Sequence, residues 1–193
     1  VVFRLRPWLE TIVAGIAPRA REKNLELVSD FAADLPARVV GDAQKLRQVL
    51  ENLLGNAVKY TASGRVTLHV VGGSAAPSRI EFAVADTGSG IPPGDHARIF
   101  DLFSQATEGR PPEPGTGLGL PLCQRLLALM DSQLALASAP GEGSRFSFGV
   151  VLPATAIAPE ATMNLPAGYT GDRRRVLIVD DVAVNRAVLR DLL

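Results

Sequence analysis

The chain has 193 residues, of which 47% are hydrophobic, and a formal net charge of zero. It is therefore long enough for one domain with an additional segment, and it has no overall field that would attract nucleic acid, so no nucleic-acid partner is expected. The single cysteine, Cys123, excludes an internal disulfide and a cysteine-rich metal site, which fits a reducing, cytoplasmic setting. No apolar run approaches the roughly 20 residues of a membrane span. Because the chain has no initiating methionine, we expect a piece of a longer protein, and membrane attachment elsewhere stays open.

In chain order, the apolar residues 2–5 precede a predicted helix over 9–20 and a predicted strand over 25–31. Gly41 and Asp42 supply an N-cap for the clearest helix of the chain. Residues 65–71 and 79–86 alternate at period two and predict paired strands. The apolar positions that define the clearest helix recur at i, i+3 and i+4: Leu46, Val49, Leu50, Leu53, Leu54, Ala57 and Val58.

The second half predicts a short helix with a turn over 92–103 and a long loop over 104–117, a length typical of lids and binding loops. A helix around Cys123 and a hairpin of 134–138 with 144–152 follow. We therefore expect an α+β fold, a two-layer sandwich in which helices cover one face of a mixed sheet. This domain would span 1–153, an Ala/Pro-rich linker 154–172, and the start of another α/β domain 173–193.

The polar face of the clearest helix contains Lys45, Gln48, Asn52, Asn56 and Lys59. A solvated surface is the usual explanation for such a stripe, and this explanation is favoured for Lys45 and Gln48. Asparagine is a mediocre helix former, so two of them one turn apart suggest amides directed at a ligand. The spacing alone supports the two interpretations of the asparagines equally.

Asp86 ends the second predicted strand, in DTGSGIP, and shares the parity of the apolar residues Ile80, Phe82 and Val84. A carboxylate on that side costs free energy unless donors meet it. A turn at the strand end is the simpler explanation in isolation. The other explanation is that the carboxylate accepts a hydrogen bond from an adenine amino group or from a bound water.

The segment PGTGLGLPLC, residues 114–123, places three glycines directly before a helical pattern. Glycines there let backbone N–H groups approach a phosphate at a helix N-terminus. The segment is not a dinucleotide-binding G-x-G-x-x-G, because Leu120 stands where a glycine is needed, and the chain has no P-loop. A different way of holding a phosphate is indicated.

Four segments, ENLLGNAVKYT, DTGSGIP, IFDLFSQ and GTGLGLPLC, occur in this order and resemble the N, G1, F and G2 boxes of the sensor histidine kinase ATP-binding domain. That family belongs to a wider group with DNA gyrase and MutL, and the resemblance covers roughly residues 1–152. It implies a Bergerat-type α/β sandwich that binds ATP and Mg²⁺.

The resemblance also implies roles for individual residues. Asn56 would bind Mg²⁺, with Asn52 and Lys59 beside the metal and the phosphates, and Asp86 would accept from the adenine amino group. Phe100 and Phe103 would anchor the ATP lid, whose hinges are the glycines of the G2 box. The residues implied to contact the nucleotide are Tyr60, Asp86, Gly88, Gly90, Ile91, Phe103, Gly115, Thr116, Gly117, Leu118, Gly119 and Leu120.

Gyrase-type relatives carry a glutamate at the position of Asn52, where it activates water; an amide cannot accept that proton, so hydrolysis should be poor. Phosphoryl transfer to an imidazole requires mainly positioning and Mg²⁺. His69 and His96 lack the family's phosphoacceptor context and are interpreted as structural or surface residues. The acceptor would lie on a dimerisation domain of the same protein, which implies a homodimeric full-length protein and a monomeric fragment.

The segment RRRVLIVDDVAVNR resembles the start of a response-regulator receiver domain, with Asp180 and Asp181 in an incomplete Mg²⁺ pocket. Together the resemblances imply a hybrid histidine kinase that feeds a phosphorelay to a receiver or response regulator. Two alternatives stay open. One is a degenerate nucleotide-sensing or scaffold module that signals by protein contacts, and the other is a gyrase-like ATPase, which Asn52 and the receiver-like tail oppose.

Overall fold

The computed structural model describes residues 1–72, 79–101 and 117–156. The chain divides into two compact units, Val1–Glu160 and Ala161–Leu193. The second unit, which contains the predicted receiver start, and residues 102–116 of the predicted lid lie outside the described residues. All helices and strands that the structure describes belong to the first unit.

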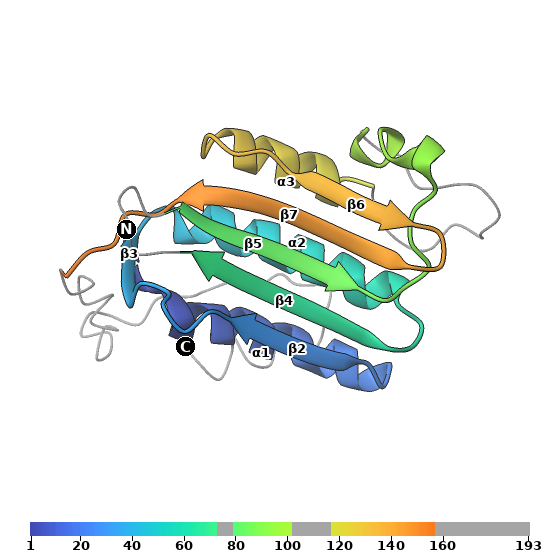
Figure 1. Ribbon diagram of the computed structural model, residues 1–193, viewed down its shortest axis with the longest axis horizontal. Coiled ribbons are helices and arrows are strands. Elements are labelled where there is room, and N and C mark those ends of the chain that lie inside the picture. The colour runs from blue at the N-terminus through green and yellow to red at the C-terminus, as the bar shows by residue number, and fades with distance from the viewer. Residues whose placement is uncertain (73–78, 102–116, 157–193) are drawn as a thin grey trace, which may run out of the picture. The chain divides into compact units, whose positions relative to one another are not determined.

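A five-stranded mixed sheet forms one layer of this unit, in the order β2-β4-β5-β7-β6 (Figure 1). Only the β2–β4 pair is parallel, and the other pairs are antiparallel. A separate two-stranded sheet pairs β1 (Val2–Arg4) with β3 (Arg38–Val40). The strands of the large sheet are β2 (Glu26–Phe31), β4 (Arg65–Gly72), β5 (Arg79–Asp86), β6 (Ala135–Ala139) and β7 (Gly143–Val151).

The helices α1 (Leu5–Glu22), α2 (Ala43–Tyr60) and α3 (Gly119–Ala128) cover one face of the large sheet (Figure 1). The core lies between the layers because alternate strand residues point toward the helices. Phe82 on β5 and Phe148 on β7 stack there with ring centroids 5.0 Å apart. The predicted two-layer α+β sandwich is confirmed.

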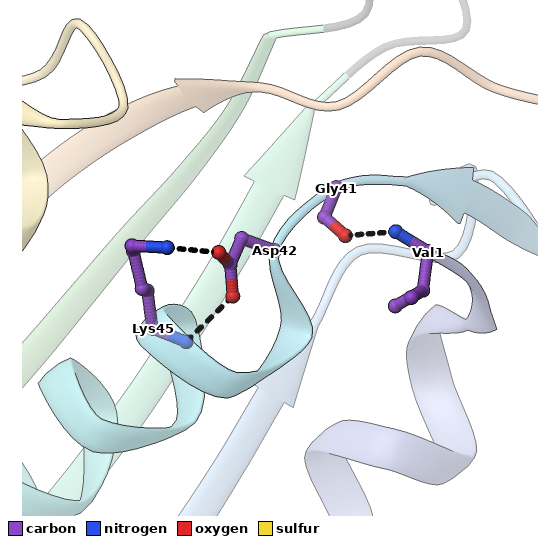
Figure 2. Close-up of polar contacts among 4 residues, drawn as sticks. All are labelled: Val1, Gly41, Asp42 and Lys45. Carbon is purple, nitrogen blue, oxygen red and sulfur yellow. Dashed lines mark hydrogen bonds and ion pairs between the residues drawn. The ribbon is translucent and has the colours of Figure 1, made fainter.

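Asp42 is the N-cap of α2, as the sequence predicted. Its side chain accepts from the backbone N–H of Lys45 at 2.9 Å and forms an ion pair with the Lys45 ammonium (Figure 2). These contacts with Lys45 hold the pKa of Asp42 below its ordinary value. Lys45 therefore contributes to the N-cap of α2. The amino group of Val1 also donates to the carbonyl of Gly41, at 2.8 Å, which places β1 beside the start of α2 (Figure 2).

Several boundaries differ from the prediction. α1 begins at Leu5 rather than residue 9, because Pro7 falls in the first turn, where its missing N–H is tolerated. Over the described part of 92–103, two 3₁₀ turns, η1 (Pro93–Asp95) and η2 (Arg98–Phe100), replace the single predicted helix. Consecutive prolines at its start explain this, since they remove backbone donors.

After β7 the chain continues alongside β3. The backbone N–H of Val40 donates to the carbonyl of Pro153 at 2.9 Å, and that of Thr155 donates to the carbonyl of Arg38 at 3.1 Å.

In the ranges that the structure describes, no helix is both long enough and apolar enough to cross a membrane.

Candidate nucleotide-binding site

The amides of Asn52 and Asn56 face the N-terminus of α3. Both residues are half-buried on α2, and a Cβ built on Gly119 would lie 3.6 Å from Oδ1 of Asn52 and 3.9 Å from Nδ2 of Asn56. The N-terminus of a helix presents backbone donors and a positive dipole end, which favour an anion. The two asparagines and Gly119, distant in the sequence, thus form one polar cluster, which we call the amide cluster.

Cys123 lies one turn further along α3 than Gly119 and contacts α2. Its thiol is fully buried and donates to the backbone carbonyl of Val49 at 3.8 Å. The side chain of Asn52 lies close enough to this thiol to influence its pKa. Burial raises the pKa of the thiol to about 12. Cys123 is therefore a buried residue of the core that lies beside the amide cluster.

The carboxylate of Asp86 is half-buried at the end of β5, and burial raises its pKa. Hydrogen bonds from the backbone of Gly88, at 2.8 Å, and of Ser144 act in the opposite direction by stabilising the charged form. The turn suggested by the sequence at the end of this strand is therefore formed. The Asp86 carboxylate in it is a partly desolvated acceptor, which suits recognition of an amino group.

The glycines of the G1 box are required by packing within the protein. A Cβ on Gly88 would lie 2.5 Å from the carbonyl oxygen of Tyr60, and one on Gly90 would lie 1.8 Å from that of Ala139. Gly90 also has φ +66°, in the left-handed region. These contacts press the loop after Asp86 against the end of α2 on one side and the end of β6 on the other.

Lys59 and Tyr60 form a pair at the C-terminal end of α2. The Lys59 ammonium donates to the Tyr60 hydroxyl at 3.0 Å and lies 4.6 Å from the centroid of its ring. Tyr60 is 40% exposed, so an aromatic surface and a cation are accessible beside the G1 loop. Such a surface suits a base and a phosphate.

The remaining predicted site residues differ in their surroundings. Gly117 has φ +67°, Leu118 is exposed, and Ile91, Phe100 and Leu120 pack against the core. Among the described residues, no group of three or more His, Cys, Asp or Glu side chains is placed to hold a metal ion. The predicted site residues outside the described ranges are Phe103, Gly115, Thr116, Asp180 and Asp181.

Neither histidine joins the amide cluster. His69 lies on β4, with Nδ1 2.8 Å from a carboxylate oxygen of Asp30. His96 lies with Nε2 3.0 Å from the carbonyl of Ile91. Both side chains therefore have local partners, as expected of structural or surface residues.

Ser138 is a residue of the site that the sequence analysis missed. Its hydroxyl accepts from the backbone N–H of Ile91 at 2.8 Å and donates to the carbonyl of Gly143 at 2.8 Å. It lies 3.1 Å from the hydroxyl of Ser144, which pairs with Asp86 across the sheet. The strand alternation offered a signal, because it puts both serines on the otherwise apolar face.

The sandwich, the amide cluster and the half-buried Asp86 define an ATP-binding catalytic domain of the histidine kinase type. Residues 41–155 match the family described as "Histidine kinase-, DNA gyrase B-, and HSP90-like ATPase". The chain belongs to this family.

The sensor protein GacS of Pseudomonas syringae pv. syringae is 37% identical over 186 residues, which are 95% of this chain and 20% of that protein. The sensor histidine kinase AruS of Pseudomonas aeruginosa is 39% identical over 196 residues, 100% of this chain and 19% of that protein. The chain thus spans about one fifth of the length of the curated relatives it matches.

Many solved structures are similar, and two of them illustrate the range. The full-length ShkA structure, in complex with AMPPNP, has a TM-score of 0.70 and 36% identity over 83% of this chain and 32% of that one. The nucleotide-free catalytic domain of the histidine kinase ThkA has a TM-score of 0.63 and 23% identity, over 78% of this chain and 95% of that one. The second likeness concerns the fold alone.

Proposed function

We propose that this chain is the catalytic part of a cytoplasmic hybrid sensor histidine kinase. It binds ATP with Mg²⁺ and transfers the γ-phosphate to a histidine on the dimerisation domain of the same, homodimeric protein. The observation that carries the proposal is the amide cluster, in which two asparagine side chains meet the N-terminus of α3. The order of the four boxes adds support, as do the relatives named a sensor protein and a sensor histidine kinase.

In this proposal Asn56 supplies an oxygen ligand to Mg²⁺ and Asn52 lies beside the metal and the phosphates. Amide and phosphate oxygens suit a hard cation that retains some of its waters. Asp86 accepts from the adenine amino group, and Lys59 and Tyr60 flank the nucleotide. Gly117, Leu118 and Leu120 contribute from the described part of the G2 box, and Phe103, Gly115 and Thr116 from the lid.

Transfer is favoured over hydrolysis because the amide cluster contains no base that could activate water. Glu51 is adjacent to Asn52 in sequence, but it is exposed and its carboxylate lies 3.5 Å from the guanidinium of Arg47. Phosphoryl transfer depends mainly on positioning and neutralisation of charge. An imidazole brings its own nucleophilic nitrogen.

The C-terminal segment extends the proposal to a phosphorelay. Residues 173–193 would begin a receiver domain, with Asp180 and Asp181 as part of a Mg²⁺ site whose phosphoacceptor lies beyond this chain. The phosphate would then pass from histidine to aspartate.

Incubation of the 193-residue chain with γ-labelled ATP, Mg²⁺ and a dimerisation hairpin that carries an acceptor histidine tests the proposal. We expect label on the hairpin that is labile to acid and stable to base, as a phosphoramidate is. Nucleotide binding without transfer would favour the scaffold alternative, and steady phosphate release without a hairpin would favour an ATPase.

A further inference from the structure

The C-terminal end of α2 is closed by a lysine from another helix. Lys23 is the C-cap of α1, and Asn24 follows it in the left-handed conformation at φ 55°. The Lys23 ammonium donates to the carbonyls of Val58 at 3.0 Å and Lys59 at 2.6 Å, and lies 3.5 Å from that of Thr61. An ammonium group has three N–H donors, so all of them can be directed at the end of α2.

These contacts supply partners that the helix itself lacks. The last four carbonyl groups of an α-helix have no continuing turn to accept from. Thr61 bonds the carbonyl of Ala57 with both its N–H, at 3.1 Å, and its hydroxyl, at 2.7 Å. Lys23 bonds the next two carbonyls, and its positive charge lies at the negative end of the helix dipole.

The remaining carbonyl, that of Tyr60, connects this helix end to the site. It packs so closely on Gly88 that a Cβ there would lie only 2.5 Å away. The N–H of Gly88 in turn donates to Asp86 at 2.8 Å. The turn that holds Asp86 thus rests on the segment that Lys23 holds.

We propose that Lys23 is a positioning residue of the nucleotide site: by fixing the carbonyls at the end of α2, it holds the Lys59–Tyr60 pair and the Asp86 turn in the arrangement that binds ATP. The inference rests on the proposed function, because it assigns Lys23 to that same site. Lys23 acts through the backbone of α2. The end of α1 therefore contributes to ATP affinity.

The test compares Lys23→Met, which keeps an unbranched apolar stem, with Arg21→Met in the 193-residue chain. Arg21 is an exposed basic residue on the last turn of α1 and is a matched control for loss of charge. We expect Lys23→Met to weaken Mg-ATP binding by about fivefold or more, in the range of coupling between neighbouring elements, whereas Arg21→Met stays within about twofold of the unaltered chain. Hydrogen exchange should accelerate at the Gly88 amide relative to the amide of Leu50 in the middle of α2.

Unaltered ATP affinity in folded Lys23→Met overturns the proposal. If that variant does not fold, Lys23→Gln replaces it with Arg21→Gln as control, and the same selective loss is required. If the unaltered chain itself binds no ATP, the proposed function fails. The exchange rate of the Gly88 amide in Lys23→Met then still decides whether Lys23 positions the turn: acceleration supports the positioning role, and no change rejects it.

Discussion

Gly119 lies with its backbone against the side chain of Asn52, so that the Cβ it lacks would be 3.6 Å from Oδ1 of the amide. This contact joins the start of α3, which lies within the G2 box, to the N box on α2. Because 3.6 Å is an ordinary van der Waals distance, a methyl group would fit there without strain. It would, however, occupy the space in front of both amides of the cluster.

Gly119→Ala should therefore separate stability from binding. Alanine is the better helix former, so the free energy of unfolding should stay unchanged or rise by up to about 1 kcal/mol. ATP affinity should fall by about tenfold, equivalent to about 1.4 kcal/mol. Thermal denaturation and calorimetric titration measure the two effects. Gly15→Ala, in an open position on α1, should stabilise the chain and leave ATP binding intact.

Asn56→Ala should weaken Mg-ATP binding by about tenfold or more, because it removes a proposed oxygen ligand of the metal. The loss should be much smaller when ATP is titrated in the presence of EDTA. Gln48→Ala, an exposed position on the same helix, is the matched control and should change neither titration. An equal loss with and without Mg²⁺ would show that Asn56 does not hold the metal.

Asp86→Asn should weaken ATP binding and stabilise the fold. Burial raises the pKa of Asp86, so the folded protein binds this proton more tightly than the unfolded chain does. The contribution of Asp86 to stability therefore decreases as pH rises from the ordinary carboxyl pKa through the raised folded value. The asparagine keeps an acceptor for the Gly88 N–H but has no charge to desolvate.

Denaturant unfolding of both proteins between about pH 3 and pH 7 measures this difference, across the ordinary carboxyl pKa of about 3.9. The stability advantage of Asp86→Asn should grow with pH through the titration of Asp86 and then level off. An advantage that shrinks as pH rises would mean that the carboxylate is stabilised, not destabilised, by folding.

Gly90→Ala should destabilise the chain by about 2 kcal/mol or more, since the residue has φ +66° and a Cβ would collide with the carbonyl of Ala139. Gly94→Ala, a position with open space and no left-handed φ, should change stability by less than about 0.5 kcal/mol. Thermal unfolding of the pair measures the contrast. Equal effects would contradict the close approach of the G1 loop to β6.

Cys123 should not react with thiol reagents in the folded protein at pH 8, because it is fully buried and the pKa of its thiol is about 12. Labelling should proceed only through unfolding. Saturating ATP should slow it further, since a ligand that binds the native state lowers the unfolded population. Rapid labelling under native conditions would contradict the packing of α3 on α2.

The helix α2 was predictable because every local signal agrees: Asp42 caps its N-terminus, apolar residues form one face, and polar residues form the opposite face. The sheet and its helix-covered face followed from strand alternation. The start of α1 at Leu5 was missed because Pro7 reads locally as a break, and the 3₁₀ turns after Pro92 carry too few residues for a periodic signal.

The asparagines were identified as a candidate pair, but the sequence left a solvated surface equally supported. Both lie beside Gly119, and Asn52 also lies beside Cys123, which distinguishes them from a solvated surface. Gly119 and Cys123 are on another helix, and the local sequence does not indicate that proximity. Lys23 is a similar case, since a lysine at a helix end is ordinary and only the tertiary fold brings α2 to it.

The most direct test of the central claim is calorimetric titration of the 193-residue chain with ATP, with and without Mg²⁺, beside Asp86→Asn. We expect saturable binding of one nucleotide that is strengthened by Mg²⁺ and weakened in the Asp86→Asn variant. A chain that is demonstrably folded and binds no ATP under either condition would contradict this claim.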